Sequence, residues 1–199
     1  MSLMDQLTQV VASQLAPQAS QKTGMNQNLA AQMMPMAMAV IMNGLKKNAS
    51  TPQGAEALSR ALENHDGSLL NNVSKIGDDN VLADGQKILG HILGGKRGQT
   101  EAALAKSAGV NQDQIGSLLA MAAPAILASL GRAKREQGLD SSALAGLVTE
   151  EGVRAQKAAP TQFGGLMNFL DADGDGDFTD DLMEGMGKSL MNGLFGNKQ

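Results

Sequence analysis

The side chains most able to do chemistry lie in an acidic stretch near the C-terminus. It reads Asp171-Ala172-Asp173-Gly174-Asp175-Gly176-Asp177-Phe178-Thr179-Asp180-Asp181. Carboxylates at positions 1, 3 and 5 with glycine at position 6 form the first half of an EF-hand-type loop, in which alternate side chains turn their oxygens toward one hard cation. Position 12 is Leu182, where an EF-hand loop has an acidic residue that binds the cation through both carboxylate oxygens, so Asp181 must supply the last ligand. The pattern predicts calcium as a structural cofactor, with no organic cofactor, and the predicted ligands are Asp171, Asp173, Asp175, Asp177 and Asp181.

The alternative for this stretch is an acidic, solvated loop in which Thr179 caps the following helix. Repulsion among close carboxylates favours the metal-bound alternative. An earlier segment, Asp66-Gly67-Ser68, aligns with Asp175-Gly176-Asp177, but Leu62 and Asn64 stand where the later loop has acids. We expect the earlier loop to keep the turn and to bind no metal.

A helix-turn-helix pattern over residues 100–119 is the second candidate. Leu104, Ile115 and Leu118 fall at packing positions, and Gly109 falls at the turn. The residues that would contact DNA are Asn111, Gln112 and Gln114. No Lys or Arg lies among residues 111–117 to contact phosphate, and the formal net charge of the chain is −4. Helix packing is therefore preferred, nucleic acid is disfavoured as a partner, and a DNA-binding regulator stays the alternative.

No recognisable catalytic set is present. The segment from Gly90 to Arg97 matches most of a phosphate-binding loop, but Arg97 replaces the Ser or Thr that would ligate Mg²⁺, and no strand is expected before it. The sequence has no Cys, and neither His65 nor His91 stands in a catalytic arrangement. We expect a non-enzymatic protein, with a hydrolase as a distant alternative. The roles of His91 and Gly94-Gly95-Lys96 stay open.

Composition indicates an all-α protein. Of the 199 residues 42% are hydrophobic but only 2% aromatic, so Ala, Leu and Met must build the core, and these residues favour helices. No signal peptide pattern is visible at the N-terminus, and the most apolar window, Ala30–Met42, is shorter than the roughly 20 residues that a membrane span needs. The expectation is a soluble, cytoplasmic protein with an unknown protein partner and an unknown oligomeric state.

An internal repeat organises the chain. Gly24–Leu45 aligns without a gap with Gly109–Leu130, at a shift of 85 residues. The repeat predicts two related helical units, residues 1–95 and 96–199, or one compact domain containing both.

Local signals place the elements. Pro17 is expected to end a helix over residues 1–16, and Gly24 and Asn26 or Asn28 to separate two helices. Pro35 should kink or split the first central helix, and Pro124 should open or kink the second. Asn111 with Gln114 three residues later resembles a capping box. Residues 94–98 are expected to form a linker, Thr100 to cap the next helix, and residues 139–151 to form a helix before a looser segment.

Several of these segments, in the same order, resemble the YidB-like family of bacterial proteins. The resemblance is carried by Lys47–Gly54, His65–Ser68 and Leu89–Lys96, by a helix–Gly–helix unit, and by Leu170–Gly176 with Asp180-Asp181-Leu182. It implies an all-α fold and a bacterial source, and no catalytic residues. The leading hypothesis is a helical binding or scaffold protein with a calcium-binding loop at residues 171–181.

Overall fold

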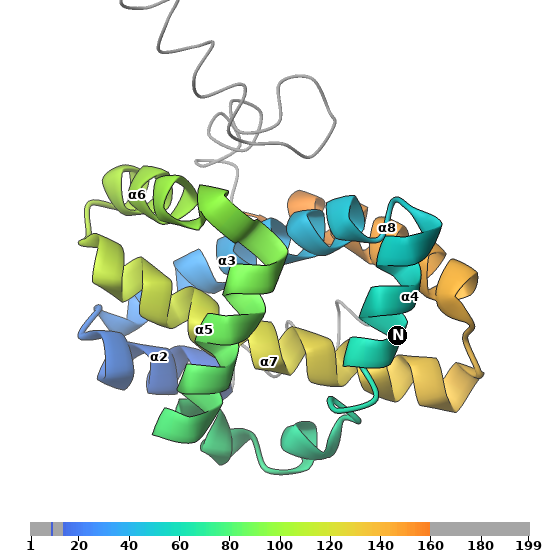
Figure 1. Ribbon diagram of the computed structural model, residues 1–199. Helices are drawn as coiled ribbons and strands as arrows, with labels where there is room; N and C mark the ends of the chain where they lie inside the picture. The colour runs from blue at the N-terminus through green and yellow to red at the C-terminus, as the bar shows by residue number, and fades with distance from the viewer. Residues whose placement is uncertain (1–8, 10–13, 160–199) are drawn as a thin grey trace, which may run out of the picture.

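The structure, a computed structural model, describes residue 9 and residues 14–159, and this part of the chain contains helices and no strand (Figure 1). The all-α prediction is confirmed. The α-helices are α2 (Ala16–Thr23), α3 (Gln27–Asn48), α4 (Pro52–Ala61), α5 (Asp79–Leu93), α6 (Arg97–Ala108), α7 (Gln112–Gln137) and α8 (Ser141–Ala158). Short 3₁₀ helices η2 (Ser68–Asn71), η3 (Val73–Gly77) and η4 (Gly94–Lys96) connect them.

Helices α3 and α7 form the centre of the protein. Nearly every residue from Met33 to Leu45 and from Leu118 to Leu130 is buried. The two helices begin alike, because Gly24 and Gly109 end the preceding helices in left-handed conformation, with φ of 69° and 66°. The Asn26 and Asn111 side chains then accept hydrogen bonds from the first turns of α3 and α7. These caps confirm the local predictions, while the duplication itself stays a prediction.

The prolines do not end the helices that contain them. Pro35 lies inside α3 and Pro124 inside α7, and each helix is continuous through its proline. The expected end of a helix at Pro17 is also wrong, since Pro17 lies in the first turn of α2. A proline is tolerated at this position because the first N–H groups of a helix have no intrahelical partner.

Residues 94–98 are not a linker. They form η4 and the first turn of α6, which begins at Arg97, three residues before the predicted cap. Thr100 is buried inside α6, and its hydroxyl donates to the Lys96 carbonyl at 3.1 Å. Helix α8 likewise runs to Ala158, seven residues beyond the prediction, because its residues Gly152 and Ala155 are buried against the core.

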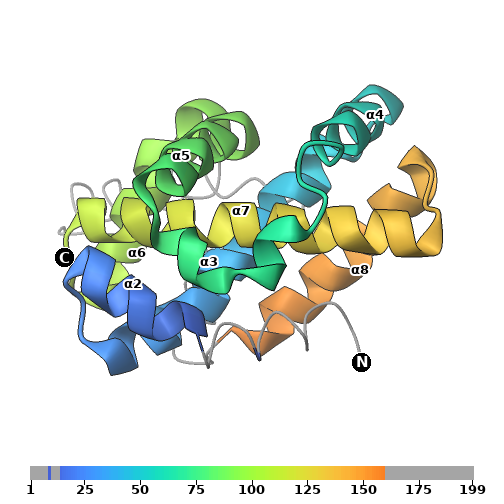
Figure 2. The same ribbon diagram turned by 90° about the horizontal axis from the view of Figure 1, so that it is seen from below.

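Helices α4 and α5 rise from one side of α7 and stand apart from each other (Figures 1 and 2). One continuous cluster of buried side chains joins α3, α7 and α8 with α4 and α5, and so includes residues from both halves of the repeat. The boundary at residue 95 stays a prediction. Among the described residues, α7 is also the one helix long and apolar enough to cross a membrane. This is weak evidence for a membrane span, because 89% of the apolar window of α7 is buried inside the protein.

Candidate functional site

A cleft of about 640 Å³ lies between α4 and α5, above α3 and α7. This volume is in the range of pockets that hold a small ligand or the side chains of a partner. Its floor includes Leu45 of α3 and Leu127 of α7, and its walls carry Leu58 of α4 and Ile88 and Ile92 of α5. The remaining lining residues are Asn48, Gly54, Ala57, Ala61, His65, Asp84, Lys87 and His91.

Asn48 fixes the α5 wall to the floor. It is the last residue of α3, and its side-chain amide donates to the carbonyls of His91 at 3.2 Å and Ile92 at 3.3 Å. Carbonyls in the last turn of a helix have no intrahelical donor, so Asn48 satisfies groups that α5 itself leaves open. The α4 wall begins three residues after α3, where Thr51 accepts from the Gly54 N–H at 3.1 Å and Pro52 occupies the first helical turn.

Gly85 allows α5 to lie directly on α7. A Cβ at this position would be 1.9 Å from the carbonyl oxygen of Ala120. In a regular helix that oxygen accepts from the N–H four residues later, but residue 124 is a proline and has no N–H. The proline therefore leaves a carbonyl without its helical donor, the backbone of α5 packs against that carbonyl, and this contact places α5 on α7.

Polar groups occur on both walls. Asp84, Lys87 and His91 lie on α5, and His65 lies in the turn after α4. The two histidines of the chain, which sequence reasoning left without a role, therefore line the same cleft. Residues 9 and 14–159 contain no group of three or more His, Cys, Asp or Glu that could hold a metal ion. The arrangement suits an apolar ligand with a polar edge.

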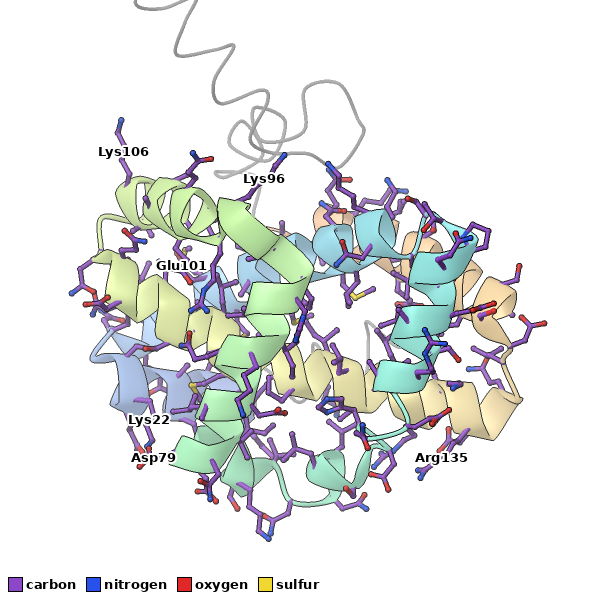
Figure 3. The ribbon with its side chains drawn as sticks, in the orientation of Figure 1. Lys22, Asp79, Lys96, Glu101, Lys106 and Arg135 are labelled. Carbon is purple, nitrogen blue, oxygen red and sulfur yellow. The ribbon has the colours of Figure 1, made fainter. Side chains whose placement is uncertain are left out.

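The loop at Asp66-Gly67-Ser68 is bound by arginines of α7. Arg132 donates through one nitrogen to the Gly67 carbonyl and the Asn71 side-chain oxygen, both at 2.8 Å. Arg135, near the end of α7 (Figure 3), donates to the Asp66 carbonyl and forms an ion pair with the Asp66 carboxylate at 3.3 Å. The predicted turn is present, and guanidinium groups supply positive charge to its oxygens.

Asp66 is a strong acceptor within this turn. Its carboxylate accepts from the Ser68 N–H at 2.9 Å. Hydrogen bonds from the side chain and backbone of Ser68, together with the charge of Arg135, lower the pKa of Asp66. All three favour the ionised form, and together they outweigh desolvation, which acts in the opposite direction and is a larger effect than the charge of Arg135. Arg132 and Arg135 thus hold this loop.

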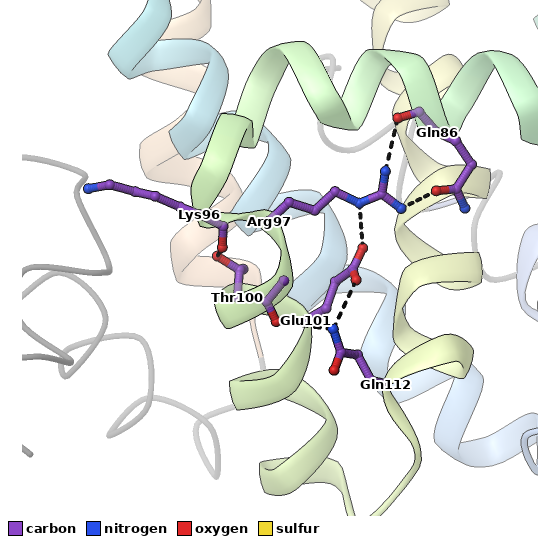
Figure 4. Close-up of polar contacts among 7 residues, drawn as sticks. Gln86, Lys96, Arg97, Thr100, Glu101 and Gln112 are labelled. Atoms are coloured by element: carbon purple, nitrogen blue, oxygen red, sulfur yellow. Dashed lines mark hydrogen bonds and ion pairs between the residues drawn. The ribbon is translucent and has the colours of Figure 1, made fainter.

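A second polar cluster joins α5, α6 and α7 (Figure 4). The buried Glu101 accepts from the Arg97 Nε at 2.7 Å, and the other carboxylate oxygen lies 3.4 Å from the Gln112 side-chain amide. Arg97 also donates to the backbone and side-chain oxygens of Gln86. Arg97, which is the departure from the phosphate-loop pattern, is therefore the residue that fixes η4 between α5 and α6.

The side chains of the DNA-binding alternative make intramolecular contacts. Asn111 and Gln114 form the predicted capping box, and Gln114 also donates to the Thr23 carbonyl at 2.9 Å. Gln112 donates to the Gly98 carbonyl at 3.2 Å in addition to Glu101. From Ile115 to Ala133 nearly every residue of α7 is buried. These contacts favour helix packing as the role of the segment.

The predicted calcium ligands are not brought together with any of these groups, since Asp171, Asp173, Asp175, Asp177 and Asp181 lie outside the described residues. Sequence reasoning also missed the cleft. The available signal was the i, i+3, i+4 and i+7 spacing of Asp84, Lys87, Ile88 and His91, which places them on one face of α5.

In its described residues the protein is all-helical and carries a cleft of ligand size. The chain belongs to a family of bacterial proteins of unknown function, DUF937, whose profile matches residues 5–133. This result confirms the YidB-like resemblance. No curated protein and no solved structure matches the chain.

Proposed function

We propose that the protein is a non-enzymatic binding protein that holds an amphipathic helical segment in the cleft between α4 and α5. The observation that carries the proposal is the cleft itself, with an apolar floor, two helical walls and charged or imidazole groups along its edge. A helix presents this combination, an apolar stripe bounded by polar residues. The α5 wall is held by the Asn48 side chain, which donates to two of its carbonyls, and by the main-chain contact at Gly85, and this rigidity suits recognition of a shaped partner.

Binding of a neutral apolar fluorophore, N-phenyl-1-naphthylamine, tests whether the cleft accepts apolar groups. Ala61 is exposed and lines the cleft, so Ala61→Trp should cover the opening without disturbing the core. Ala102→Trp places the same side chain at an exposed position of α6, away from the cleft. We expect Ala61→Trp to weaken dye binding at least tenfold and Ala102→Trp to leave it unchanged. Equal binding by all forms, or binding by no form of the chain, would contradict the proposal.

We also propose that Asp171, Asp173, Asp175, Asp177 and Asp181 bind calcium. The support is the alternation of carboxylates and the glycine at position 6 of the loop. Titration calorimetry with Ca²⁺ and Mg²⁺ tests this on the wild type and Asp173→Ala. We expect one calcium per chain and loss of binding in the variant. Absence of binding at millimolar calcium would mean that the stretch is only an acidic cap of the following helix. The proposal for the cleft would not be affected.

A further inference from the structure

We infer that the segment held in the cleft belongs to the same chain and comprises residues 182–195. The inference rests on the proposed function, because it names the occupant of the proposed cleft. Residues 182–195 lie outside the described part of the structure, and their sequence is Leu-Met-Glu-Gly-Met-Gly-Lys-Ser-Leu-Met-Asn-Gly-Leu-Phe.

The segment has the apolar pattern that the cleft requires. Leu182, Met186, Leu190 and Leu194 recur every four residues and therefore share one face of a helix. Three glycines lie within the same 14 residues, and a helix of this length and composition is marginal alone in water. Its apolar face must be covered for it to be stable. The cleft offers Leu58, Ile88 and Ile92 on its walls to cover that face.

The part of the chain between Ala159 and the segment is long enough for the segment to reach the cleft. Residues 160–181, 22 in number, separate the last described residue from the segment. Even with residues 171–181 closed around calcium, the 11 residues 160–170 alone span up to about 36 Å when extended. Helix α3, with 22 residues, is only about 33 Å long. The cleft is therefore within reach from Ala159, and tethering gives an effective concentration that can reach the millimolar range. This favours the chain's own segment over that of a second copy.

Disulfide trapping tests the inference, because the chain has no Cys of its own. Ala61→Cys is combined in turn with Leu182→Cys, Met186→Cys, Leu190→Cys and Leu194→Cys, so that the result does not depend on one register. The control pairs the same four positions with Ala102→Cys on α6. After mild oxidation of the full chain, intact mass and non-reducing gels distinguish disulfides within a chain from those between chains, and circular dichroism checks that each variant folds.

We expect an intrachain disulfide in at least one Ala61→Cys pair, at least tenfold faster than in the matched Ala102→Cys pair. Interchain disulfides at Ala61→Cys would assign the cleft to a second copy and overturn the inference. Equal trapping at both positions, or none at Ala61→Cys, would also overturn it.

The apolar dye separates this inference from the proposed function. In Met186→Asp/Leu190→Asp the segment loses its apolar face, so we expect at least tenfold tighter dye binding than in the wild type, and loss of that gain when Ala61→Trp is added. If the wild type and the double variant bind the dye equally and Ala61→Trp weakens both, the cleft functions but the segment is not its occupant. If neither binds dye, the proposed function fails too.

Discussion

Gly85 of α5 lies against the main-chain carbonyl of Ala120 in α7, so close that a Cβ would stand 1.9 Å from the oxygen. Pro124 is the reason that this oxygen is open to contact, since proline removes the N–H that would otherwise bond it. A proline and a glycine in different helices thus act together. The main-chain contact places α5 on α7 and positions one wall of the cleft.

Gly85→Ala should lower the free energy of unfolding by about 1–3 kcal/mol, because a methyl group has no space beside a main-chain oxygen. Gly90→Ala is the matched control on the same helix, because a Cβ there meets nothing within 4 Å. We expect the control to be neutral or stabilising by about 0.5–1 kcal/mol, as is usual for glycine to alanine in a helix. Urea denaturation measures both, and equal effects would contradict the packing described for Gly85.

Arg132→Ala should destabilise the protein by about 1–2 kcal/mol, because two hydrogen bonds from a half-buried guanidinium to the Gly67 carbonyl and Asn71 are lost. Lys106→Ala, at an exposed position of α6, is the control for removing a positive charge and should change stability by less than about 0.5 kcal/mol. Arg132→Lys keeps the charge, but its side chain is one atom shorter and its ammonium does not reach the position of the nitrogen that makes both bonds, so we expect most of the destabilisation to remain. Full stability in Arg132→Lys would show that charge alone matters.

The carboxyl group of Asp66 should titrate below the usual aspartate pKa in the folded protein. We expect Ser68→Ala to raise the pKa more than Arg135→Gln does, since Ser68 makes the larger contribution. The folded-state pKa is below the unfolded value of about 3.9, so the ionised group contributes stability above that value and loses it as the pH falls through the lowered pKa. Carbon-detected NMR titration measures the shift, and an unchanged pKa in both variants would contradict the described turn.

Gln112→Ala/Gln114→Ala should lower the stability of the protein and should not change its DNA binding. The variant loses the contacts to Gly98, Glu101 and Thr23, each worth about 0.5–1.5 kcal/mol. In gel-shift assays with random duplex at low salt, we expect neither the wild type nor the variant to bind. Salt-sensitive binding by the wild type that the variant loses would revive the DNA-binding regulator.

Short-range signals made much of the helical architecture predictable. Gly24 and Asn26, and again Gly109 and Asn111, act through contacts within a few residues, so the ends of the central helices could be read directly from the sequence. The errors came where packing overrides local preference. Residues 94–98 look like a glycine-rich linker, but Arg97 and Glu101 join this segment to α5 and α7.

The sequence by itself determined the all-α class, the caps and the turn at Asp66, because each depends on neighbouring residues. Only the tertiary structure decided the cleft and the loop that the arginines hold. Asn48 meets the end of α5 across 43 residues, and Arg132 meets Gly67 across 65. Contacts at such separations depend on how α3, α5 and α7 cross, and the crossing is set by the packing of small residues such as Gly85 in the core.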